Sequence, residues 1–164
     1  IELYVSQREG VLPYLSEFVY IKENGRYGLE GNDRTYSLTL MPDVSLSRTT
    51  VRKKLRECYK LQRAVEITSQ LLQLEIFHPL LKHTLMKPAE IYAALKEKGY
   101  DWDFLLSETR SWHTLDDEEH PGFPLSTLDL CRVARGEYHP YWLEADCKTI
   151  KPEYLKKKIG KLHE

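Results

Sequence analysis

The chain has 164 residues, of which 41% are hydrophobic, 30% charged and 11% aromatic, and its formal net charge is −1. A chain of this length and composition can bury enough apolar surface to fold without a disulfide or a metal ion, which excludes a disordered tail, a collagen and a small disulfide-stabilised secreted domain. No apolar run approaches the roughly 18 residues of a membrane-spanning helix, which excludes a membrane protein.

The three cysteines, Cys58, Cys131 and Cys147, are odd in number and irregularly spaced. This usage is typical of a reducing compartment, so we expect an intracellular protein of the cytoplasm or nucleus. The length of the chain fits a single domain, residues 1–164. Because the sequence begins with Ile1 rather than Met, we expect this domain to be excised from a longer protein.

Residues 1–44 predict an antiparallel β-meander. The expected strands are Leu3–Val5 (a possible fourth strand), Phe18–Ile21, Arg26–Glu30 and Thr35–Met41. Asn24-Gly25 follows the run at Phe18–Ile21 and is the preferred pair for a type I′ hairpin turn, because both central residues need positive φ. Tyr36, Leu38 and Leu40 alternate with polar residues, so we expect them to share the buried face of the sheet.

Residues 45–78 predict one long amphipathic helix packed on this sheet. Pro42-Asp43 is expected to break the preceding strand, and Ser45 or Ser47 can cap the helix. From Arg48 to about Leu74 there is no glycine or proline, and apolar residues recur at spacings of four and three. We expect Val51, Leu55, Val65 and Leu72 to be buried and Arg52 and Lys53 to face water.

Residues 79–164 predict a mixed helical and irregular half, and the whole chain therefore belongs to the α+β class. Pro79 ends the long helix, and a second helix is expected from Pro88 to Gly99. The remaining expected pieces are a short turn at Trp102–Leu106, a loop over 107–127, extended segments at Leu128–Val133 and Tyr141–Ala145, and a basic C-terminal helix at Glu153–Leu162.

Charge is segregated along the chain despite the net charge of −1. Residues 48–63 hold seven basic residues and one acidic residue, residues 148–161 hold six and one, and residues 101–119 hold one basic and seven acidic residues. These blocks either neutralise one another in the fold or leave a basic face for a polyanion.

The segment Ser47–Arg56 resembles the recognition-helix stretch of winged helix-turn-helix repressors, in which small polar residues approach bases and arginines hold phosphates. The preceding segment is expected to be a strand and the turn lacks glycine, so we assign no family. A weaker hypothesis remains, in which exposed cations of this segment bind phosphate groups; the alternative is an ordinary solvated helix face. The expected nucleic-acid-binding residues are Arg48, Arg52, Lys53 and Arg56, with Lys156 and Lys157 of the C-terminal helix.

Our first functional hypothesis is therefore a non-enzymatic binding module that contacts nucleic-acid phosphates. The second is a protein–protein interaction domain that uses its acidic segment and its aromatic residues, namely Trp102, Phe104, Trp112, Tyr138, Tyr141 and Trp142. The two hypotheses differ in salt dependence, because phosphate binding weakens steeply with ionic strength whereas an apolar interface does not.

A metal-dependent nuclease is the third hypothesis. Asp43 together with Glu144, Asp146 and Lys148 is similar to the Asp and Glu/Asp-x-Lys set of restriction-type nucleases, in which carboxylates hold a divalent ion and the lysine helps to activate water.

A zinc site is also conceivable, from His113, His120, Cys131, His139 and Cys147. Their spacing matches no zinc knuckle, however, so we expect no cofactor and no metal required for folding.

Overall fold

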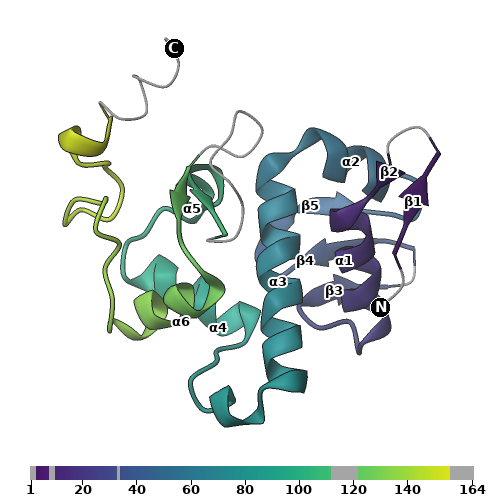
Figure 1. Cartoon of the computed structure of the whole chain (residues 1–164), viewed down its shortest axis with the longest axis horizontal. Coiled ribbons are helices and arrows are strands. Elements are labelled where there is room, and N and C mark those ends of the chain that lie inside the picture. Colours follow the sequence, from purple (N-terminus) through teal and green to yellow (C-terminus); the bar gives the residue numbers. More distant parts are fainter. Residues whose placement is uncertain (1–2, 8–9, 33, 112–121, 156–164) are drawn as a thin grey trace. The chain divides into compact units, whose positions relative to one another are not determined.

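The structure is a computed structural model of the chain, and it describes residues 3–7, 10–32, 34–111 and 122–155. The backbone divides into two compact units, unit 1 (Ile1–Tyr92) and unit 2 (Ala93–Glu164), which are described separately. The chain contains helices and antiparallel strands, so the expected α+β class is confirmed (Figure 1). The expectation of one domain stays a prediction. No helix in the described ranges is long and apolar enough to cross a membrane.

The expected antiparallel meander is present in unit 1, with its strands displaced along the chain. The strands, in their order across the sheet, are β3 (Leu29–Gly31), β4 (Tyr36–Leu38) and β5 (Met41–Leu46). Tyr36, Leu38 and Leu40 are all buried, as their alternation predicted. The predicted strand break at Pro42 is wrong: β5 runs through it, because β5 is an edge strand and can lack one backbone N–H donor.

The predicted strand at Phe18–Ile21 is wrong, because these residues lie in helix α1 (Pro13–Glu23). Pro13 stands in the first turn, where its missing N–H leaves no helical bond unmade. Asn24 and Gly25 end the helix instead of forming a hairpin: Gly25 has φ +78° and the Asn24 side-chain amide donates to the Tyr20 carbonyl at 2.8 Å. The left-handed backbone that a type I′ turn needs also ends a helix, so the dipeptide signal was ambiguous.

The possible fourth strand at Leu3–Val5 is outside the meander. Strand β1 (Val5–Ser6) pairs with β2 (Gly10–Val11) in a separate two-stranded sheet, which we call the β1–β2 arm. The backbone next to this arm is tied to the start of α1, because the Tyr4 amide donates to Ser16 Oγ at 2.9 Å and the Tyr4 carbonyl accepts from the Leu12 amide at 2.8 Å.

The expected long helix is divided into α2 (Val51–Glu57) and α3 (Tyr59–Phe77). Cys58 lies between them with extended backbone, φ −127° and ψ 99°. The Leu55 carbonyl near the end of α2 accepts from Gln62 Nε2 at 2.7 Å, so a side chain of α3 replaces the helical donor that the break removes. The prediction of one continuous helix is therefore wrong, since a single extended residue leaves the four–three spacing of apolar residues unchanged.

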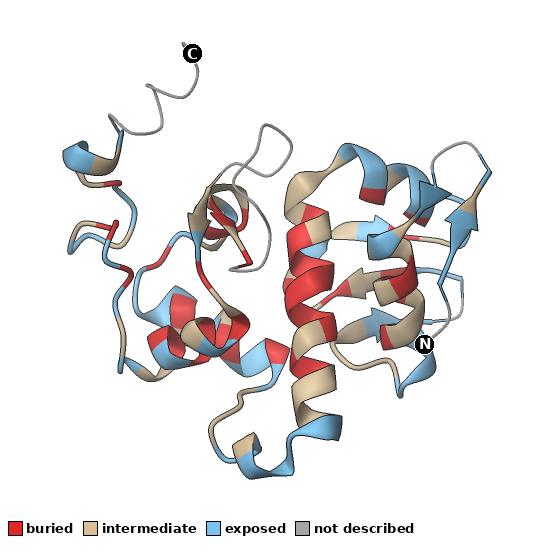
Figure 2. Ribbon diagram, in the orientation of Figure 1, coloured by how far each residue is buried: buried red, intermediate tan, exposed pale blue. Residues whose placement is uncertain are grey.

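The expected faces of these helices are confirmed. Val51, Leu55, Val65 and Leu72 are buried, and Arg52 and Lys53 are exposed. Figure 2 shows buried residues along much of α3. Helix α1 packs along α3, and its Phe18 ring meets the Tyr36 ring of β4 edge to face with centroids 6.1 Å apart, so α1 joins the sheet to α3.

Beyond α3 the chain makes a 3-10 turn, η1 (Pro79–Leu81), and then helix α4 (Pro88–Glu97), which leads into unit 2. The predicted start at Pro88 is confirmed, and Gly99 has φ +82° just beyond the end of the helix. Unit 2 continues with α5 (Trp102–Glu108) and a parallel pair of short strands, β6 (Thr109–Arg110) and β7 (Phe123–Pro124).

The extended segment predicted at Leu128–Val133 is wrong, because helix α6 (Thr127–Arg135) occupies it. Ser126 Oγ accepts the Asp129 amide at 3.0 Å at the start of α6, and Gly136, with φ +79°, ends it. These two caps were visible in the sequence and outweigh the apolar run between them. In the second predicted extended segment, Leu143 forms an isolated antiparallel bridge with Ile150.

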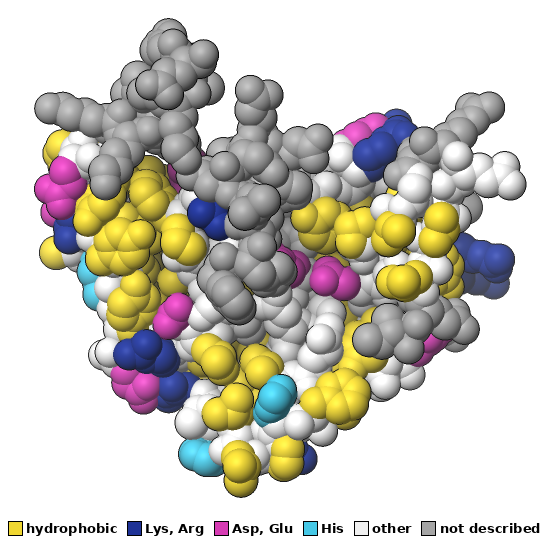
Figure 3. All heavy atoms as spheres, in the orientation of Figure 1, with side chains coloured by type: hydrophobic (Ala, Val, Ile, Leu, Met, Phe, Trp, Pro, Cys, Tyr) yellow, Lys and Arg dark blue, Asp and Glu magenta, His cyan; other side chains and the backbone are white. Residues whose placement is uncertain are grey.

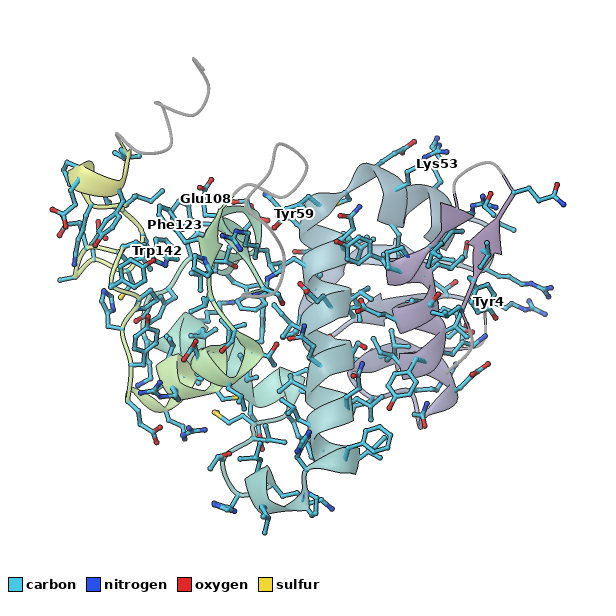
Figure 4. The ribbon with its side chains drawn as sticks, in the orientation of Figure 1. Tyr4, Lys53, Tyr59, Glu108, Phe123 and Trp142 are labelled. Carbon is cyan, nitrogen blue, oxygen red and sulfur yellow. The ribbon has the colours of Figure 1, made fainter. Side chains whose placement is uncertain are left out.

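The largest buried side chain of unit 2 is Trp142, in a core that is otherwise mostly aliphatic. Trp142 is fully buried and stacks on Phe123, with ring centroids 4.5 Å apart and planes at 10°, while Phe104 lies 6.4 Å from it (Figure 4). The chain has a short helical turn at 152–155, and the rest of the predicted C-terminal helix lies outside the described residues.

Replacing Gln62 tests the hydrogen bond that spans the α2–α3 break. We expect Gln62→Ala to lower the free energy of unfolding by about 1–3 kcal/mol, because it leaves the Leu55 carbonyl without its donor. Chemical denaturation followed by circular dichroism measures this change. Gln73→Ala is the matched control, since Gln73 donates to the Ser69 hydroxyl, which can rotate to another partner. Equal losses in both variants would contradict a special role for Gln62.

Candidate nucleic-acid interface

The four cations predicted to bind phosphate lie on and just before α2. Arg48 stands in the turn that precedes the helix, Arg52 and Lys53 lie in its first turn, and Arg56 lies in its last turn. All four side chains are exposed. We call this set the α2 basic surface; Figure 4 shows Lys53 at the outer edge of unit 1.

A cluster of hydroxyl groups shapes the turn before α2. Ser47 Oγ lies 3.1 Å from Thr49 Oγ1 and 2.9 Å from Thr50 Oγ1, and the Ser47 amide donates to Thr50 Oγ1 at 3.1 Å. The Lys54 ammonium donates to the Ser45 carbonyl at 2.5 Å, which turns that lysine back toward β5. The turn is therefore held by its own side chains, and Arg48 is carried on a defined backbone.

Two contacts engage the arginines of the α2 basic surface. Arg52 Nη2 donates to Ser6 Oγ on the β1–β2 arm at 3.1 Å. Arg56 Nη2 lies 3.8 Å from Glu57 Oε1, and these two side chains are 63% and 53% exposed, so water screens the pair strongly. In Figure 3, Lys and Arg side chains lie beside acidic ones at the end of unit 1 where Figure 1 labels α2.

The helix dipole distinguishes two of these cations from a third. A helix start favours acidic side chains, yet the first turn of α2 contains none and holds Arg52 and Lys53 instead. Arg56, by contrast, lies in the last turn, where the dipole favours a cation. Helix stability therefore does not explain why Arg52 and Lys53, in the first turn of the short helix α2, are positively charged.

The break at Cys58 does not complete a helix-turn-helix. One extended residue separates α2 from α3, whereas that motif joins its helices by a turn of about three to four residues. The other predicted phosphate ligands, Lys156 and Lys157, lie outside the described residues.

The predicted metal ligands are not gathered where the structure describes them. No group of three or more His, Cys, Asp or Glu residues in the described ranges is placed to hold a metal ion. Cys131 is fully buried in α6, and both ring nitrogens of His139 take part in hydrogen bonds. His113 and His120 lie outside the described residues.

The nuclease-like carboxylate Asp146 has a structural use. Its Oδ1 accepts the amides of Lys148 and Thr149, both at 2.9 Å, and its other oxygen accepts from the Thr149 hydroxyl. The Thr149 hydroxyl and the two amides hold the pKa of Asp146 below its ordinary value. Asp146 therefore closes the tight turn at 144–149. Asp43 belongs to unit 1, whereas Glu144, Asp146 and Lys148 belong to unit 2.

The predicted aromatic surface is partly a core. Trp142 is fully buried, Trp102, Phe104 and Tyr138 are half-buried, and Tyr141 is 48% exposed. The Arg132 guanidinium covers the Tyr138 ring at 5.3 Å from its centroid. Trp112 and the acidic residues 116–119 lie outside the described residues.

A charged cluster between α1 and α3 was missed in the sequence. Arg63 Nη1 donates to Glu66 Oε2 at 2.6 Å, and these side chains are 1% and 11% exposed. Glu17 on α1 faces the pair and has a buried carboxyl oxygen, Oε2, without a hydrogen-bond partner in the described part of the chain. Burial, and then the charge of Glu66, raises the pKa of Glu17 to about 8, although Arg63 opposes this. Burial and the two carboxylates also raise the pKa of Tyr14 to about 12.

No sequence signal marks this cluster, because its members come from helices far apart in the chain and Phe18–Ile21 looked like a strand. A carboxyl group with a raised pKa is a common feature of active sites, but buried structural networks produce the same shift. Because Arg63 pairs with Glu66 and both face Glu17 across two packed helices, we treat the cluster as structural.

Comparison with known proteins finds no matching family model, no matching curated protein and no matching solved structure. The function of the chain must therefore be inferred from its residues and their geometry.

The Glu17 cluster predicts stability that falls as pH rises. Below the ordinary carboxyl pKa of 4.5, Glu17 is protonated in the folded and unfolded states alike; between 4.5 and about 8 the folded state holds a proton that the unfolded state has lost. Over this pH range, Glu17 lowers the free energy of unfolding by at most about 1.4 kcal/mol for each unit by which the pH rises. Glu17→Gln should reduce this decline and stabilise the protein above pH 8.

Thermal unfolding measured at a series of pH values tests this prediction. Glu23→Gln, which removes an exposed carboxylate from the same helix, is the matched control and should keep the wild-type pH dependence. A Glu17→Gln variant with an unchanged pH dependence would show that Glu17 is ionised in the folded state at neutral pH.

Proposed function

We propose that unit 1 is a nucleic-acid-binding module that contacts phosphate groups through the α2 basic surface, Arg48, Arg52, Lys53 and Arg56. The observation that carries this proposal is the exposure of all four cations on one short element, two of them in a helix turn where the dipole disfavours positive charge. A residue that lowers the stability of the helix in which it lies is often one that serves a function.

The side chains suit phosphate better than base recognition. An arginine guanidinium presents a planar fork of donors that can bind two phosphate oxygens at once, and a lysine adds a mobile point charge. Arg52 and Arg56 are separated by one turn of α2, so both can follow a row of phosphates. We therefore expect binding with little sequence preference and an affinity typical of non-specific complexes, with Kd of roughly 10⁻⁴–10⁻⁶ M at physiological salt.

A protein partner is the second candidate function, and the β1–β2 arm favours it. Leu3, Val5 and Val11 are 65%, 67% and 54% exposed. Exposed apolar side chains on a short arm are typical of a contact surface for another protein. Both proposals place the protein inside the cell.

Charge reversal tests the phosphate proposal. We expect Arg52→Glu together with Lys53→Glu to weaken binding of a fluorescently labelled duplex or single strand by at least about tenfold at low salt, because two attractive contacts become repulsive. The thermal midpoint should change by no more than about 2–4 °C, since both side chains are exposed. Fluorescence anisotropy and differential scanning fluorimetry measure the two effects.

The matched control is Lys82→Glu with Lys87→Glu, which makes the same change of net charge at two exposed positions of unit 1 outside α2. This control should bind within about twofold of wild type. The logarithm of the wild-type association constant for a duplex should fall with the logarithm of salt concentration with a slope of about −3 to −4 if all four cations contact phosphates. Absence of binding to any nucleic acid at low salt would overturn the proposal and leave the protein-partner function.

A further inference from the structure

A cavity of about 300 Å³ in unit 2 brings together side chains that our functional hypotheses do not use as a group. Its lining includes Tyr100, His139 and Cys147, together with Lys98 and Gly136. The volume is at the lower end of the range for small-molecule sites. The cavity therefore contains a thiol, a phenol and an imidazole around a space that a small ligand can enter.

Hydrogen bonds define the proton positions on His139. Its Nε2 faces the carbonyl oxygens of Leu143 and Glu144, at 3.3 and 3.2 Å. Carbonyl oxygens can only accept, so Nε2 carries the proton of the neutral ring and donates to them. Nδ1 is then an acceptor, and the Tyr100 hydroxyl, 2.8 Å away, donates to it. The imidazole is thus oriented as a base toward the cavity.

The turn at 144–149 carries Cys147, which lines the same cavity as Tyr100 and His139. The Cys147 amide donates to the Glu144 carbonyl at 3.1 Å, and the residue has φ +63°. Its thiol donates to the Ala145 carbonyl oxygen at 3.7 Å. Burial raises the pKa of Tyr100, and so do the charge of Cys147 and a hydrogen bond between the two side chains. The Tyr100 hydroxyl is therefore bonded to the imidazole in a cavity that the Cys147 thiol also lines.

This chain can carry a proton from sulfur to nitrogen. When the protonated thiol turns from the Ala145 carbonyl to Tyr100, Cys147 donates to the Tyr100 oxygen while Tyr100 donates to His139 Nδ1. When two protons each move one position along the chain, the result is a thiolate that accepts from the Tyr100 hydroxyl and an imidazolium that donates to the Tyr100 oxygen. Both hydrogen bonds of the Tyr100 hydroxyl are kept in both states, and the imidazolium keeps its carbonyl partners at Nε2.

A cation lies at the same cavity. Lys98 Nζ would be 3.2 Å from a Cβ added at Gly136, so the glycine, with φ +79°, leaves room for the ammonium group. The carboxylate of Glu137, which also lines the cavity, is paired with Arg135 at 2.7 Å. An anionic group on a ligand would thus meet Lys98 while its other end approaches Cys147.

We propose that this cavity is a nucleophilic thiol site for a small anionic acyl donor. Cys147 Sγ attacks the acyl carbonyl carbon, forming a sulfur–carbon bond, and the bond from that carbon to the leaving group breaks. The thiol proton passes to Tyr100 as the Tyr100 proton passes to His139, and the reverse transfer protonates the leaving group. The product is a thioester on Cys147, which water or a second nucleophile cleaves. Cys147 is the catalytic residue; Tyr100 and His139 move its proton, and Lys98 binds the anionic group.

The test uses the full chain with two activated esters that differ in charge, nitrophenyl acetate and the mono-nitrophenyl ester of succinate. Release of nitrophenolate gives the rate, and mass spectrometry of peptides locates the acyl group. We expect acylation of Cys147 at least about tenfold faster than that of glutathione or of Cys58, with the fully buried Cys131 unmodified. Lys98→Gln should slow the succinyl ester several-fold more than the acetyl ester.

Tyr100→Phe and His139→Gln test the proton chain. Tyr100→Phe keeps the ring that lies 5.9 Å from the His139 ring, so it removes the hydroxyl with little risk to the fold. Both variants should slow both esters at least tenfold at neutral pH and shift the pH dependence of acylation toward that of glutathione. A Cys147 that reacts no faster than glutathione, or a rate and pH profile unchanged in Tyr100→Phe, would overturn the proposal; equal Lys98→Gln effects on both esters would overturn the anionic specificity.

Discussion

Unit 1 depends on how α1 and α3 share a face that contains charge. Arg63 and Glu66 are removed from water together, and their 2.6 Å contact offsets a desolvation cost that neither side chain could meet alone. Glu17 from α1 enters the same environment, where a proton on its carboxyl group costs less than a third buried charge. Because α1 also contacts the sheet through Phe18, the meander, α1 and α3 are held together around this cluster.

The position of α3 has a direct consequence for the α2 basic surface. Cys58 is extended and Gln62 completes the end of α2, so α2 is a separate short helix. Arg52 and Lys53 then lie in a first turn and Arg56 in a last turn, although in one continuous helix all of them would have been early positions. The charge that the helix dipole disfavours is therefore carried by Arg52 and Lys53.

Unit 2 has a mostly aliphatic core in which Trp142 is the largest buried side chain. The packing of Trp142 on Phe123 anchors the segment that continues into the turn at 144–149, and Asp146 closes that turn. The same carboxylate that suggested a metal-dependent nuclease therefore helps to position Cys147 beside Tyr100. The packing of Trp142 holds the backbone before the turn, and Asp146 holds the turn itself. The backbone that carries the Cys147 thiol is therefore fixed between the core of unit 2 and the cavity.

Composition and local pattern determined the α+β class, the buried alternation of Tyr36, Leu38 and Leu40, the start of α4 at Pro88 and the exposure of Arg52 and Lys53, since each follows from residues close together in the chain. Local pattern was ambiguous for α1 and α6, where apolar runs suited helix or strand and only the caps and packing decided. The α2–α3 break, the Glu17–Arg63–Glu66 cluster and the Tyr100–His139–Cys147 chain were decided by tertiary structure. Each depends on a contact between side chains of separate segments, and the local periodicity of a sequence does not predict such contacts.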